Sequence, residues 1–597
     1  MFQRLIARIS ESHTRWIAWG MAVGVLSGLS AALFFVALEY ATHLTMHELV
    51  GAAPPAPPGD VLFPASGAPD AEPRRWLLFL LPALGGLLSG LLVYRFAPEA
   101  EGAGTDEMIR AFHRARGVVR PRVPLVKAFA TIATLASGGS AGKEGPVAQI
   151  GGGIGSALAS WLGLSARDRR ILLLAGTAGG LGAIFRAPLG SAITAIEVLY
   201  REDFESDALI PCVISAVTAY VVFVLLLGGQ RIFAVPEFPL FSPIEIPGYV
   251  GLALLSVPVG RAYIALFKLV RARVFAKLPG PRALRPMLGG VFVGAIGLFV
   301  PEVLGVGWGH LQRAIDGQML VGTLALVVVA KIVATCLTVG SGGSGGVFGP
   351  TLFIGGMLGA LVGYGGAALA PAFFPNPAAF VLVGMASYFA GVASAPIGAM
   401  LMVTEMTGGY ALLPPLMLVS VLAILLARGR SIYEQQVKDR FSSPAHLGDL
   451  TLNVLEEMRV ADVYRKSERV PSVEPGTRFE RVREMVLGSG DATVPVVDSG
   501  GRLVGLLTAE QIRPVLDERQ LDGFVVAGDI AAKPMALQPD DDLFRAHELF
   551  RASGCPQIPV VLAADPEDPC AGRIVGMLDY RDLMRAYERE LARRREA

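Results

Sequence analysis

The sequence predicts an all-α polytopic membrane domain followed by a soluble α/β domain, and three observations support this fold class. Apolar residues make up 53% of the chain and charged residues only 17%, against about 25% charged in globular domains. The charge is unevenly spread, with 52 charged residues in 1–430 and 51 in 431–597. A soluble domain of that size could not bury so much apolar surface. The third observation is an internal repeat within the apolar part.

The apolar part contains both long and short hydrophobic segments. Segments long enough to span a bilayer, which takes about 20 residues, lie at 16–42, 76–96, 209–228, 247–272 and 318–339. Shorter runs, many of them interrupted by glycine or proline, lie at 124–136, 147–163, 171–199, 285–304, 350–371, 379–401 and 411–428. Short, glycine-broken segments are typical of half-helices. We therefore expect many tilted and broken helices.

The internal repeat relates two stretches of 29 residues. Residues 127–155 and 331–359 are identical at 15 of 29 positions, including Lys, Thr, Ser and Pro positions as well as Gly. A second pair, 187–198 and 395–406, aligns Glu197 with Glu405. Duplicated halves of membrane transporters commonly pack as inverted repeats, with the substrate site at their interface. We expect this arrangement here, with halves at about 16–228 and 247–430.

The repeated glycine-rich turns predict an anion site. The sequence Gly-Lys-Glu-Gly-Pro at 142–146 opens an apolar helix, and Gly-Val-Phe-Gly-Pro at 346–350 is its partner. A helix N-terminus carries partial positive charge and unpaired N–H donors, so it attracts anions. Two converging termini would form an anion site without a full positive charge, which would hold the ion too tightly to conduct.

Glu144 is the exceptional residue of this motif. A carboxylate at an anion-attracting helix terminus would occupy the anion's place, and protonation would remove the attraction, so Glu144 could act as a gate, a proton carrier, or both. The alternative is an ordinary acid in the first turn of a helix, facing water. The flanking glycines and the replacement of the acid by Phe348 in the other repeat favour the gate.

Two further pairs of charged residues occupy matched positions in the repeats of the apolar part. Lys127 and Lys331 occupy matched positions on apolar helices and are expected to extend toward a membrane interface. Glu197 and Glu405 end matched helices, where a helix-end contact or a role in transport would fit equally well.

His43, His47 and Glu48 are close in sequence at the end of the first span. No further ligand is evident, so we expect a solvated helix end and no metal site.

Several functional classes are disfavoured. The net charge of +1 and the lack of a basic stripe argue against nucleic acid as a partner. No His-Glu-x-x-His motif of a zinc protease occurs, and we expect no enzyme activity. The alternative from another class is a divalent-cation transporter regulated by the charged tail, which would need grouped carboxylates as oxygen ligands. The four cysteines have no Cys-x-x-Cys spacing, which suits free thiols.

The distribution of basic residues predicts the orientation. Arg4, Arg8 and Arg15 precede the first span, and five arginines lie in the 106–122 loop. By the positive-inside rule, the N-terminus and the tail after Arg428 lie in the cytoplasm, and the Pro-rich segment 52–75 is an exterior connector.

The charged tail contains a second repeat. Residues 494–512 are similar in sequence to residues 558–583, and each stretch is predicted to form a strand, a turn, a second strand and a helix. This pattern predicts two small α/β modules.

The motifs resemble those of the CLC family of chloride channels and chloride/proton exchangers with a C-terminal pair of CBS domains. Residues 142–149 (GKEGPVAQ) and 346–350 (GVFGP) carry the resemblance, together with Tyr433 in 431–436 (SIYEQQ). The resemblance implies a homodimer with one anion pathway in each protomer, and domains at 1–430 (membrane), 456–520 (CBS 1) and 524–590 (CBS 2). Residues 431–455 would be a linker in which Tyr433 begins the last helix.

The resemblance also implies roles for individual residues. Glu144 would be the gating glutamate, and Tyr433 would supply an inner hydroxyl donor to the anion. The backbone amides that bind the anion would be those of Lys143, Glu144, Gly145, Val347 and Phe348.

Two departures from the family pattern matter. The signature Gly-Ser-Gly-Ile-Pro reads Gly-Ala-Gly-Thr-Asp at 102–106, so Ala103, followed by Gly104, lacks the serine hydroxyl and leaves the preference between chloride and nitrate open. The internal proton-relay glutamate of exchangers would follow Glu197, where this chain has Val198. We therefore expect chloride transport gated by Glu144 and slightly favour a channel, with a chloride/proton antiporter as the alternative.

The resemblance to CBS pairs implies an adenine nucleotide as a candidate ligand of the tail, although no cofactor is required. In the Gly-x-x-Thr-x-x-Asp motif of such modules, the first module has Thr508 but Gln511 in place of the acid. The second module has Asp582 but Asp579 in place of the threonine. Both motifs are incomplete, so a structural role for the pair is favoured.

Overall fold

The structure is a computed structural model that divides into two compact units, Met1–Ala445 and His446–Ala597. Arg4, Arg8, Gln511 and residues 447–454 of the expected linker lie outside the described residues. The structure describes residues 12–52, 54–63, 74–238, 242–446, 455, 457–467, 470–488, 493–508, 512–513, 524–563, 568 and 570–596.

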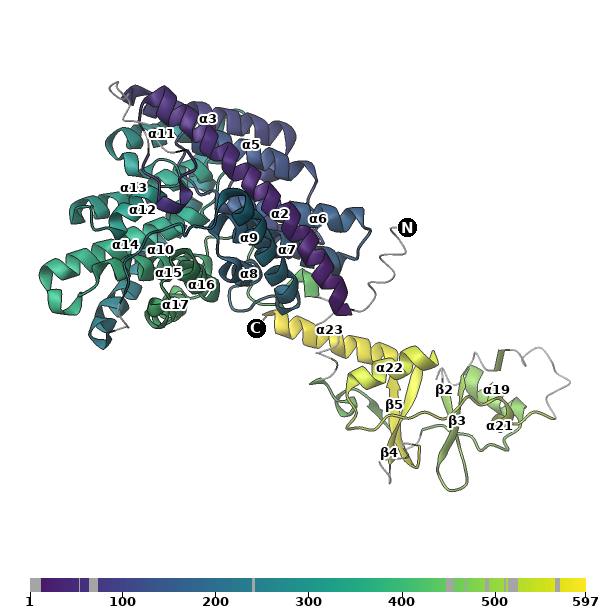
Figure 1. The fold of residues 1–597 in the computed structure, drawn as a ribbon. Coiled ribbons are helices and arrows are strands. Elements are labelled where there is room, and N and C mark those ends of the chain that lie inside the picture. Colours follow the sequence, from purple (N-terminus) through teal and green to yellow (C-terminus); the bar gives the residue numbers. More distant parts are fainter. Residues whose placement is uncertain are drawn as a thin grey trace. The chain divides into compact units, whose positions relative to one another are not determined.

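The first unit is helical (Figure 1). Eight of its described helical segments are long and apolar enough to cross a membrane, which confirms the multi-pass membrane domain. The helices of its first half are α2 (Ser12–Thr42), α3 (Arg75–Phe96), α4 (Thr105–Arg114), α5 (Arg122–Ala136), α6 (Glu144–Trp161), α7 (Ala166–Phe185), α8 (Pro188–Glu197) and α9 (Leu209–Leu227). Those of its second half are α10 (Ile246–Leu269), α11 (Arg285–Phe299), α12 (Trp308–Ile315), α13 (Val321–Gly340), α14 (Phe348–Leu369), α15 (Pro377–Ala393), α16 (Pro396–Thr407) and α17 (Leu413–Ala427).

Two of the predicted apolar runs, 171–199 and 379–401, are each broken into two helices. Arg186 and Ser394 end α7 and α15 in the left-handed conformation, with φ of 52° and 57°. Each is followed by Ala-Pro, and the proline opens the next helix at a position where its missing N–H costs nothing. The sequence analysis did not identify the short α4 and α12, because both are amphipathic.

Reciprocal hydrogen bonds join the two repeats. Gly142 and Gly346 form an antiparallel bridge, and each N–H donates to the other's carbonyl at 2.7 Å. The hydroxyl pair Thr131 and Ser344 is 3.0 Å apart, and its mirror pair, Ser140 and Thr335, is 3.2 Å apart. In the repeat, Thr131 corresponds to Thr335 and Ser140 to Ser344, so the two hydroxyl pairs are equivalent, and Gly142 bonds its own counterpart, Gly346. The two halves therefore meet around an approximate two-fold axis.

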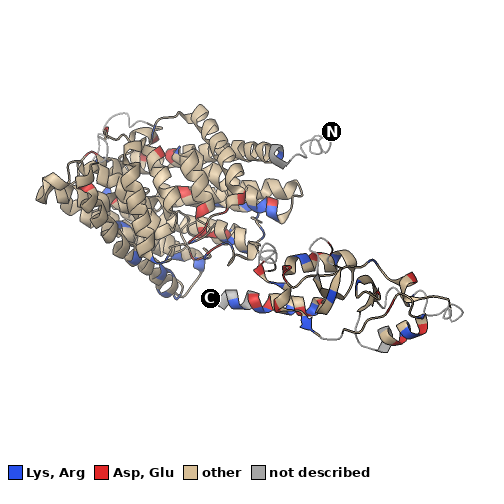
Figure 2. Ribbon diagram, turned by 90° about the horizontal axis from the view of Figure 1, so that it is seen from below, with Lys and Arg blue, Asp and Glu red and all other residues tan. Residues whose placement is uncertain are grey.

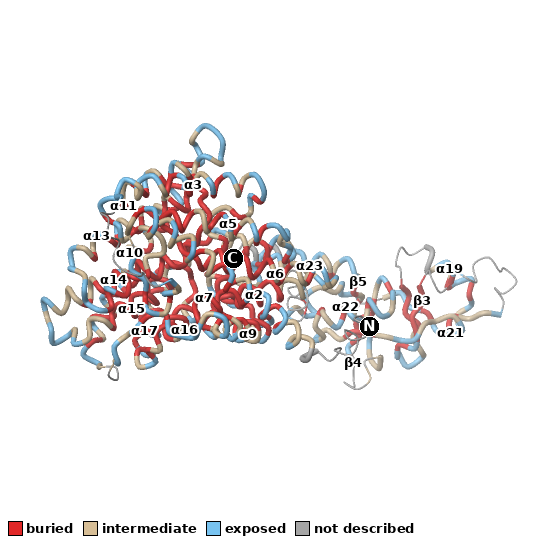
Figure 3. The backbone as a smooth tube through the Cα atoms, turned by 45° about the horizontal axis from the view of Figure 1, so that its top comes forward, coloured by how far each residue is buried: buried red, intermediate tan, exposed pale blue. Residues whose placement is uncertain are grey.

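Charge and burial follow the predicted division of the chain. Figure 2 shows few charged residues in the helical unit and many along the helices of the second unit. Figure 3 shows buried backbone throughout the middle of the helical unit, around α6, α7 and α15. This interior contains the loops that precede α6 and α14, so the glycine-rich turns lie inside the domain.

The chain after α17 differs from the expected last helix at Tyr433. Residues 428–443 form turns and one isolated bridge, followed by a 3₁₀ turn at Pro444–His446. Contacts to the membrane domain hold this segment: the Gln435 N–H donates to Asp106 at 2.9 Å, and the Gln436 side chain donates to the carbonyls of Val198 and Ala393. These hydrogen bonds to the membrane domain take the place of the backbone hydrogen bonds that a helix would form.

The second unit is an α/β pair of modules. One sheet pairs β2 (Thr493–Val497) with β3 (Leu503–Thr508), and the other has the order β1-β5-β4, from β1 (Arg465–Lys466), β4 (Gln557–Ala563) and β5 (Gly572–Asp579). The helices are α19 (Phe479–Gly488), α21 (Ala527–Ile530), α22 (Leu543–Ser553) and α23 (Tyr580–Glu596).

The two modules exchange their first segments. Strand β1 lies at the start of the first module in sequence but pairs with β5 of the second, and Val460 is buried in the core of the second. Conversely, Ala527 at the start of the second segment is buried in the core of the first. Each module therefore needs the other to complete its core.

Candidate anion-binding site

Three helix N-termini converge at the centre of the membrane domain. Helix α6 begins at Glu144, α14 at Phe348 and α4 at Thr105. A Cβ on Gly104 would lie 2.8 Å from the Gly145 carbonyl, and one on Gly346 would lie 2.8 Å from the Gly145 N–H. Only glycine permits such close backbone approach. The convergence concentrates partial positive charge and N–H donors in one place.

Glu144 lies inside this convergence. Its side chain is 1% exposed and faces the backbone amide of Gly349, in the first turn of α14. Among the described residues, neither carboxylate oxygen has a regular hydrogen-bond partner. The solvated-acid alternative for Glu144 is therefore wrong, and a carboxylate of one repeat occupies the helix terminus of the other.

A cavity of about 130 Å³ brings together four of the predicted anion-binding residues, and we call it the Tyr433 cavity. Ala103, Gly104, Val347 and Tyr433 line it. The Tyr433 hydroxyl is buried and faces the Thr105 side chain, without a hydrogen bond of regular geometry among the described residues. Four acidic residues, Glu99, Glu101, Asp106 and Glu107, also line this cavity, together with the basic Arg271; the sequence analysis did not identify this charged lining.

The Lys143 side chain points away from the Tyr433 cavity. Its ammonium group lies 2.7 Å from the Asp60 carboxylate, and Arg186 approaches the same carboxylate at 3.5 Å. All three side chains are nearly fully buried. Asp60 belongs to the segment 52–75, to which the sequence analysis gave only a connecting role. This segment instead supplies the counter-ion for the residue next to Glu144.

A second cavity, of about 340 Å³, is lined in part by Lys143, and we call it the Asp60 cavity. Lys143, Asp60, Glu39 and His310 are among its lining residues. Glu144, which follows Lys143 directly, lines neither cavity. Its buried carboxylate is therefore enclosed at the helix termini and opens into neither cavity.

Lys127 and Lys331 do not extend toward an interface, as expected from sequence, but are fully buried. The Lys127 ammonium donates to the carbonyls of Ala100 and Gly102, and that of Lys331 donates to Val303 and Gly305. These carbonyls belong to the turns before α4 and α12. The two lysines therefore hold matched turns of the two repeats, because buried carbonyls and a buried ammonium each need a partner.

Glu197 and Glu405 form helix-end contacts. Glu197 accepts the N–H groups of Ile397 and Gly398 at the start of α16, at 3.1 and 2.7 Å. Glu405 in turn accepts those of Leu189 and Gly190 at the start of α8, at 3.2 and 2.7 Å. The pair satisfies free N–H groups of the two helices.

Val198, at the expected relay position, is 2% exposed and directly follows α8 as its C-cap residue. Its carbonyl accepts the Gln436 side chain at 2.7 Å. The position is thus packed and holds no titratable group.

The two predicted nucleotide-binding residues lie in different modules. Thr508 ends β3 and is buried, whereas Asp582 lies in the first turn of α23. Arg465 contacts the Asp582 carboxylate at 2.6 Å. A nucleotide ribose would have to compete with this arginine.

Comparison with known proteins assigns the chain to a family. The family model for the voltage gated chloride channel matches residues 85–428. The chain belongs to the CLC family. The model for the CBS domain matches residues 460–518 and 526–589. The fold class predicted from sequence, a CLC membrane domain followed by CBS modules, is therefore confirmed.

Individual CLC proteins are similar over most of their length. A ClcB-like chloride channel protein of Ralstonia nicotianae is 35% identical over 356 residues, which cover 59% of this chain and 82% of the relative. The H(+)/Cl(-) exchange transporter ClcA of Vibrio campbellii is 32% identical over 434 residues, 69% of this chain and 87% of the relative. The crystal structure of a slow cyanobacterial Cl-/H+ antiporter, 25% identical, superposes with a TM-score of 0.61 and covers 70% of this chain and 96% of that one.

Proposed function

We propose that this CLC protein exchanges chloride for protons across its membrane, with Glu144 as the group that both gates the anion and carries the proton. The observation behind the proposal is the buried Glu144 carboxylate facing the Gly349 amide at the convergent helix N-termini. Similar proteins named as chloride/proton exchangers support exchange over the channel that the sequence analysis favoured.

The exchange step follows from competition for one set of N–H donors. An ionised Glu144 carboxylate and a chloride ion are both attracted to the positive helix termini, so each excludes the other from the same N–H donors. Protonation removes the charge of the carboxylate, which then leaves the donors to chloride. When the proton is released, the carboxylate returns and displaces the anion. One group thus alternates between binding a proton and occupying the anion's place.

The second candidate, a passive channel, is favoured by Val198, because an apolar side chain cannot relay a proton. The acidic lining of the Tyr433 cavity offers a different route. Glu107 is paired with Arg110 and Glu99 with Arg120, while Glu101 faces the Tyr94 hydroxyl. We propose Glu101 as the carboxylate that passes protons between the Tyr433 cavity and Glu144.

Reversal potentials in planar bilayers separate exchange from conduction. With independent chloride and proton gradients imposed, we expect the reversal potential of the wild-type protein to shift with both. A reversal potential that follows chloride alone, at every proton gradient, would instead identify a channel.

The Glu101→Gln variant tests the proton route. We expect it to keep chloride transport but to lose most of its sensitivity to the proton gradient, because the amide cannot exchange a proton. The measurement is the same reversal potential, with Glu202→Gln as an exposed-carboxylate control. Full proton sensitivity in Glu101→Gln would exclude this residue from the route.

The remaining expectations concern assembly and regulation. We propose that the protein is a homodimer with one pathway in each protomer, as the family resemblance implies, and that its N-terminus and CBS modules lie in the cytoplasm. For the CBS pair we propose at most weak adenine nucleotide binding, because neither ribose motif is complete. The exchanged segments of the two modules fit a structural role.

A further inference from the structure

The end of the first membrane-spanning helix has an unusual backbone. Helix α2 continues directly into an eight-residue π-helix, η1 (His43–Val50). π-helical turns are rare and occur frequently at functional sites. Because a π-helix closes its hydrogen bonds over five residues, residues separated by four and by five positions come to the same side. This geometry gathers His43, His47 and Glu48.

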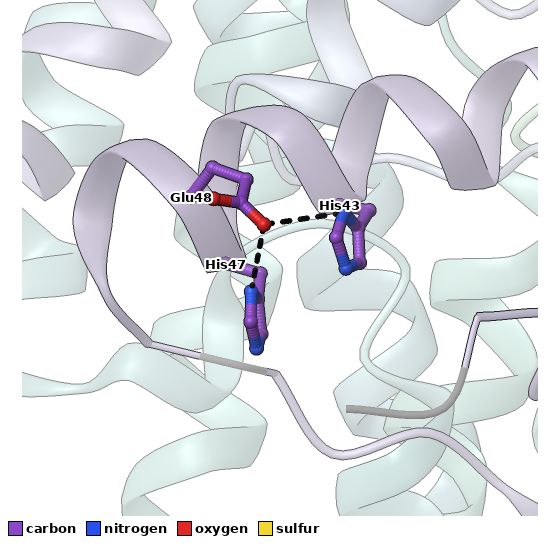
Figure 4. Close-up of side chains that lie close together, drawn as sticks. All are labelled: His43, His47 and Glu48. Carbon is purple, nitrogen blue, oxygen red and sulfur yellow. Dashed lines mark ion pairs between the residues drawn. The ribbon is translucent and has the colours of Figure 1, made fainter. Parts of the chain in front are cut away.

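The three side chains form a compact group (Figure 4). The two imidazole rings are stacked at 4.7 Å between centroids, and the Nδ1 atoms of His43 and His47 lie 4.0 and 3.4 Å from one Glu48 oxygen. One ligand atom from each residue lies within 4.8 Å of the others. Both ring nitrogens of His47 are buried and have no hydrogen-bond partner among the described residues. Glu48, by contrast, is 57% exposed, so an ion can enter from solvent.

We propose that His43, His47 and Glu48 bind a transition-metal ion of the zinc class. Two imidazoles and one carboxylate are a ligand set that Zn²⁺ uses, with water in the fourth position. Donors 3.4 to 4.0 Å apart leave room for an ion held at about 2.0–2.2 Å from each. Imidazole ligands favour Zn²⁺, Cu²⁺ or Ni²⁺ over Mg²⁺ and Ca²⁺. The sequence analysis expected a solvated helix end here, because the sequence does not reveal the π-helical turn.

Bound metal would act on the transport pathway through η1. The Thr45 hydroxyl donates to the Ala136 carbonyl at the end of α5, and Met46 packs against Gly138. Residues 138–143 connect this point to Glu144, and Met46 also lines the Asp60 cavity. An ion that fixes η1 therefore restrains the loop that carries the gate, and it slows chloride transport.

Zinc binding to the full-length, untagged protein in detergent tests the site. We expect one Zn²⁺ per chain by metal analysis after gel filtration, and a zinc-dependent rise in melting temperature, since a ligand that binds only the folded state stabilises it. The His43→Ala/His47→Ala double variant should lose both effects. Glu48→Gln, at an exposed side chain, should fold normally and weaken binding by at least about tenfold, because even the loss of a residue that only supports a metal ligand costs about 10–100-fold in affinity.

A matched control and a transport assay complete the test. His547→Ala, which removes a histidine from the second unit, should bind zinc like the wild type. Micromolar Zn²⁺ should slow chloride efflux from proteoliposomes of the wild type but not of the double variant. Equal zinc binding in the wild type, the double variant and Glu48→Gln would overturn the site. Wild-type efflux unaffected by bound zinc would overturn its action on transport.

Discussion

Glu144→Gln should transport chloride at a rate that barely depends on pH. The neutral amide imitates the protonated carboxylate, so the helix termini stay open to the anion at every pH. The wild type should accelerate as the pH falls, by up to about tenfold per pH unit, which is the limit for one titrating group. Chloride efflux from proteoliposomes at several pH values measures both profiles.

Two further variants make this result specific to the gate. Glu144→Ala removes the carboxylate altogether and should behave like the Gln variant. Glu202→Gln neutralises an exposed carboxylate and should keep the wild-type pH profile. If the profiles of wild type and Glu144→Gln superimpose, the carboxylate is not the gate.

Asp60→Asn should strongly destabilise the membrane domain. The substitution leaves the ammonium of Lys143 and the guanidinium of Arg186 buried beside a neutral amide. Removal of one partner from a buried ion pair costs about 3–5 kcal/mol, because the remaining charge has lost both water and its counter-ion. We expect a large drop in the thermal unfolding midpoint in detergent. Near-ultraviolet circular dichroism measures this midpoint.

Arg167→Gln is the control for this measurement. Its pair with Asp207 is 2.8 Å long, close to the 2.7 Å of the Lys143–Asp60 pair, but the arginine side chain is 74% exposed, and exposed pairs contribute about 0–1 kcal/mol. The unfolding midpoint of Arg167→Gln should stay close to that of the wild type. Equal midpoints for Asp60→Asn and the wild type would show that Asp60 does not neutralise the buried charges.

The sequence predicts those parts of the fold that depend on local pattern. Hydrophobic length identifies spans such as α3 and α13, and the repeat predicts that the turns at 142–146 and 346–350 are partners. The structure joins these turns through the Gly142–Gly346 bridge. The sequence analysis favoured a gate over a solvated acid at Glu144 because of its flanking glycines and Phe348 in the other repeat, and the burial of Glu144 agrees with that preference.

Features that depend on tertiary contact were not predictable in the same way. Lys127 and Lys331 are typical snorkelling residues by sequence, and only the fold places carbonyl-lined turns beside them. Asp60 stands in a Pro-rich segment whose pattern does not indicate that it folds inward onto Lys143. The helix expected at Tyr433 does not form, because hydrogen bonds from Gln435 and Gln436 to the membrane domain hold the segment in turns.

Anomalous diffraction from bromide-soaked crystals tests most directly the claim that Glu144 and the anion compete for the same helix-terminus amides. With the carboxylate ionised, the wild type should show no bromide beside the Gly349 amide, because Glu144 occupies that place. Glu144→Ala should show bromide there under the same conditions. Bromide beside Gly349 in both proteins, or in neither, would contradict the account.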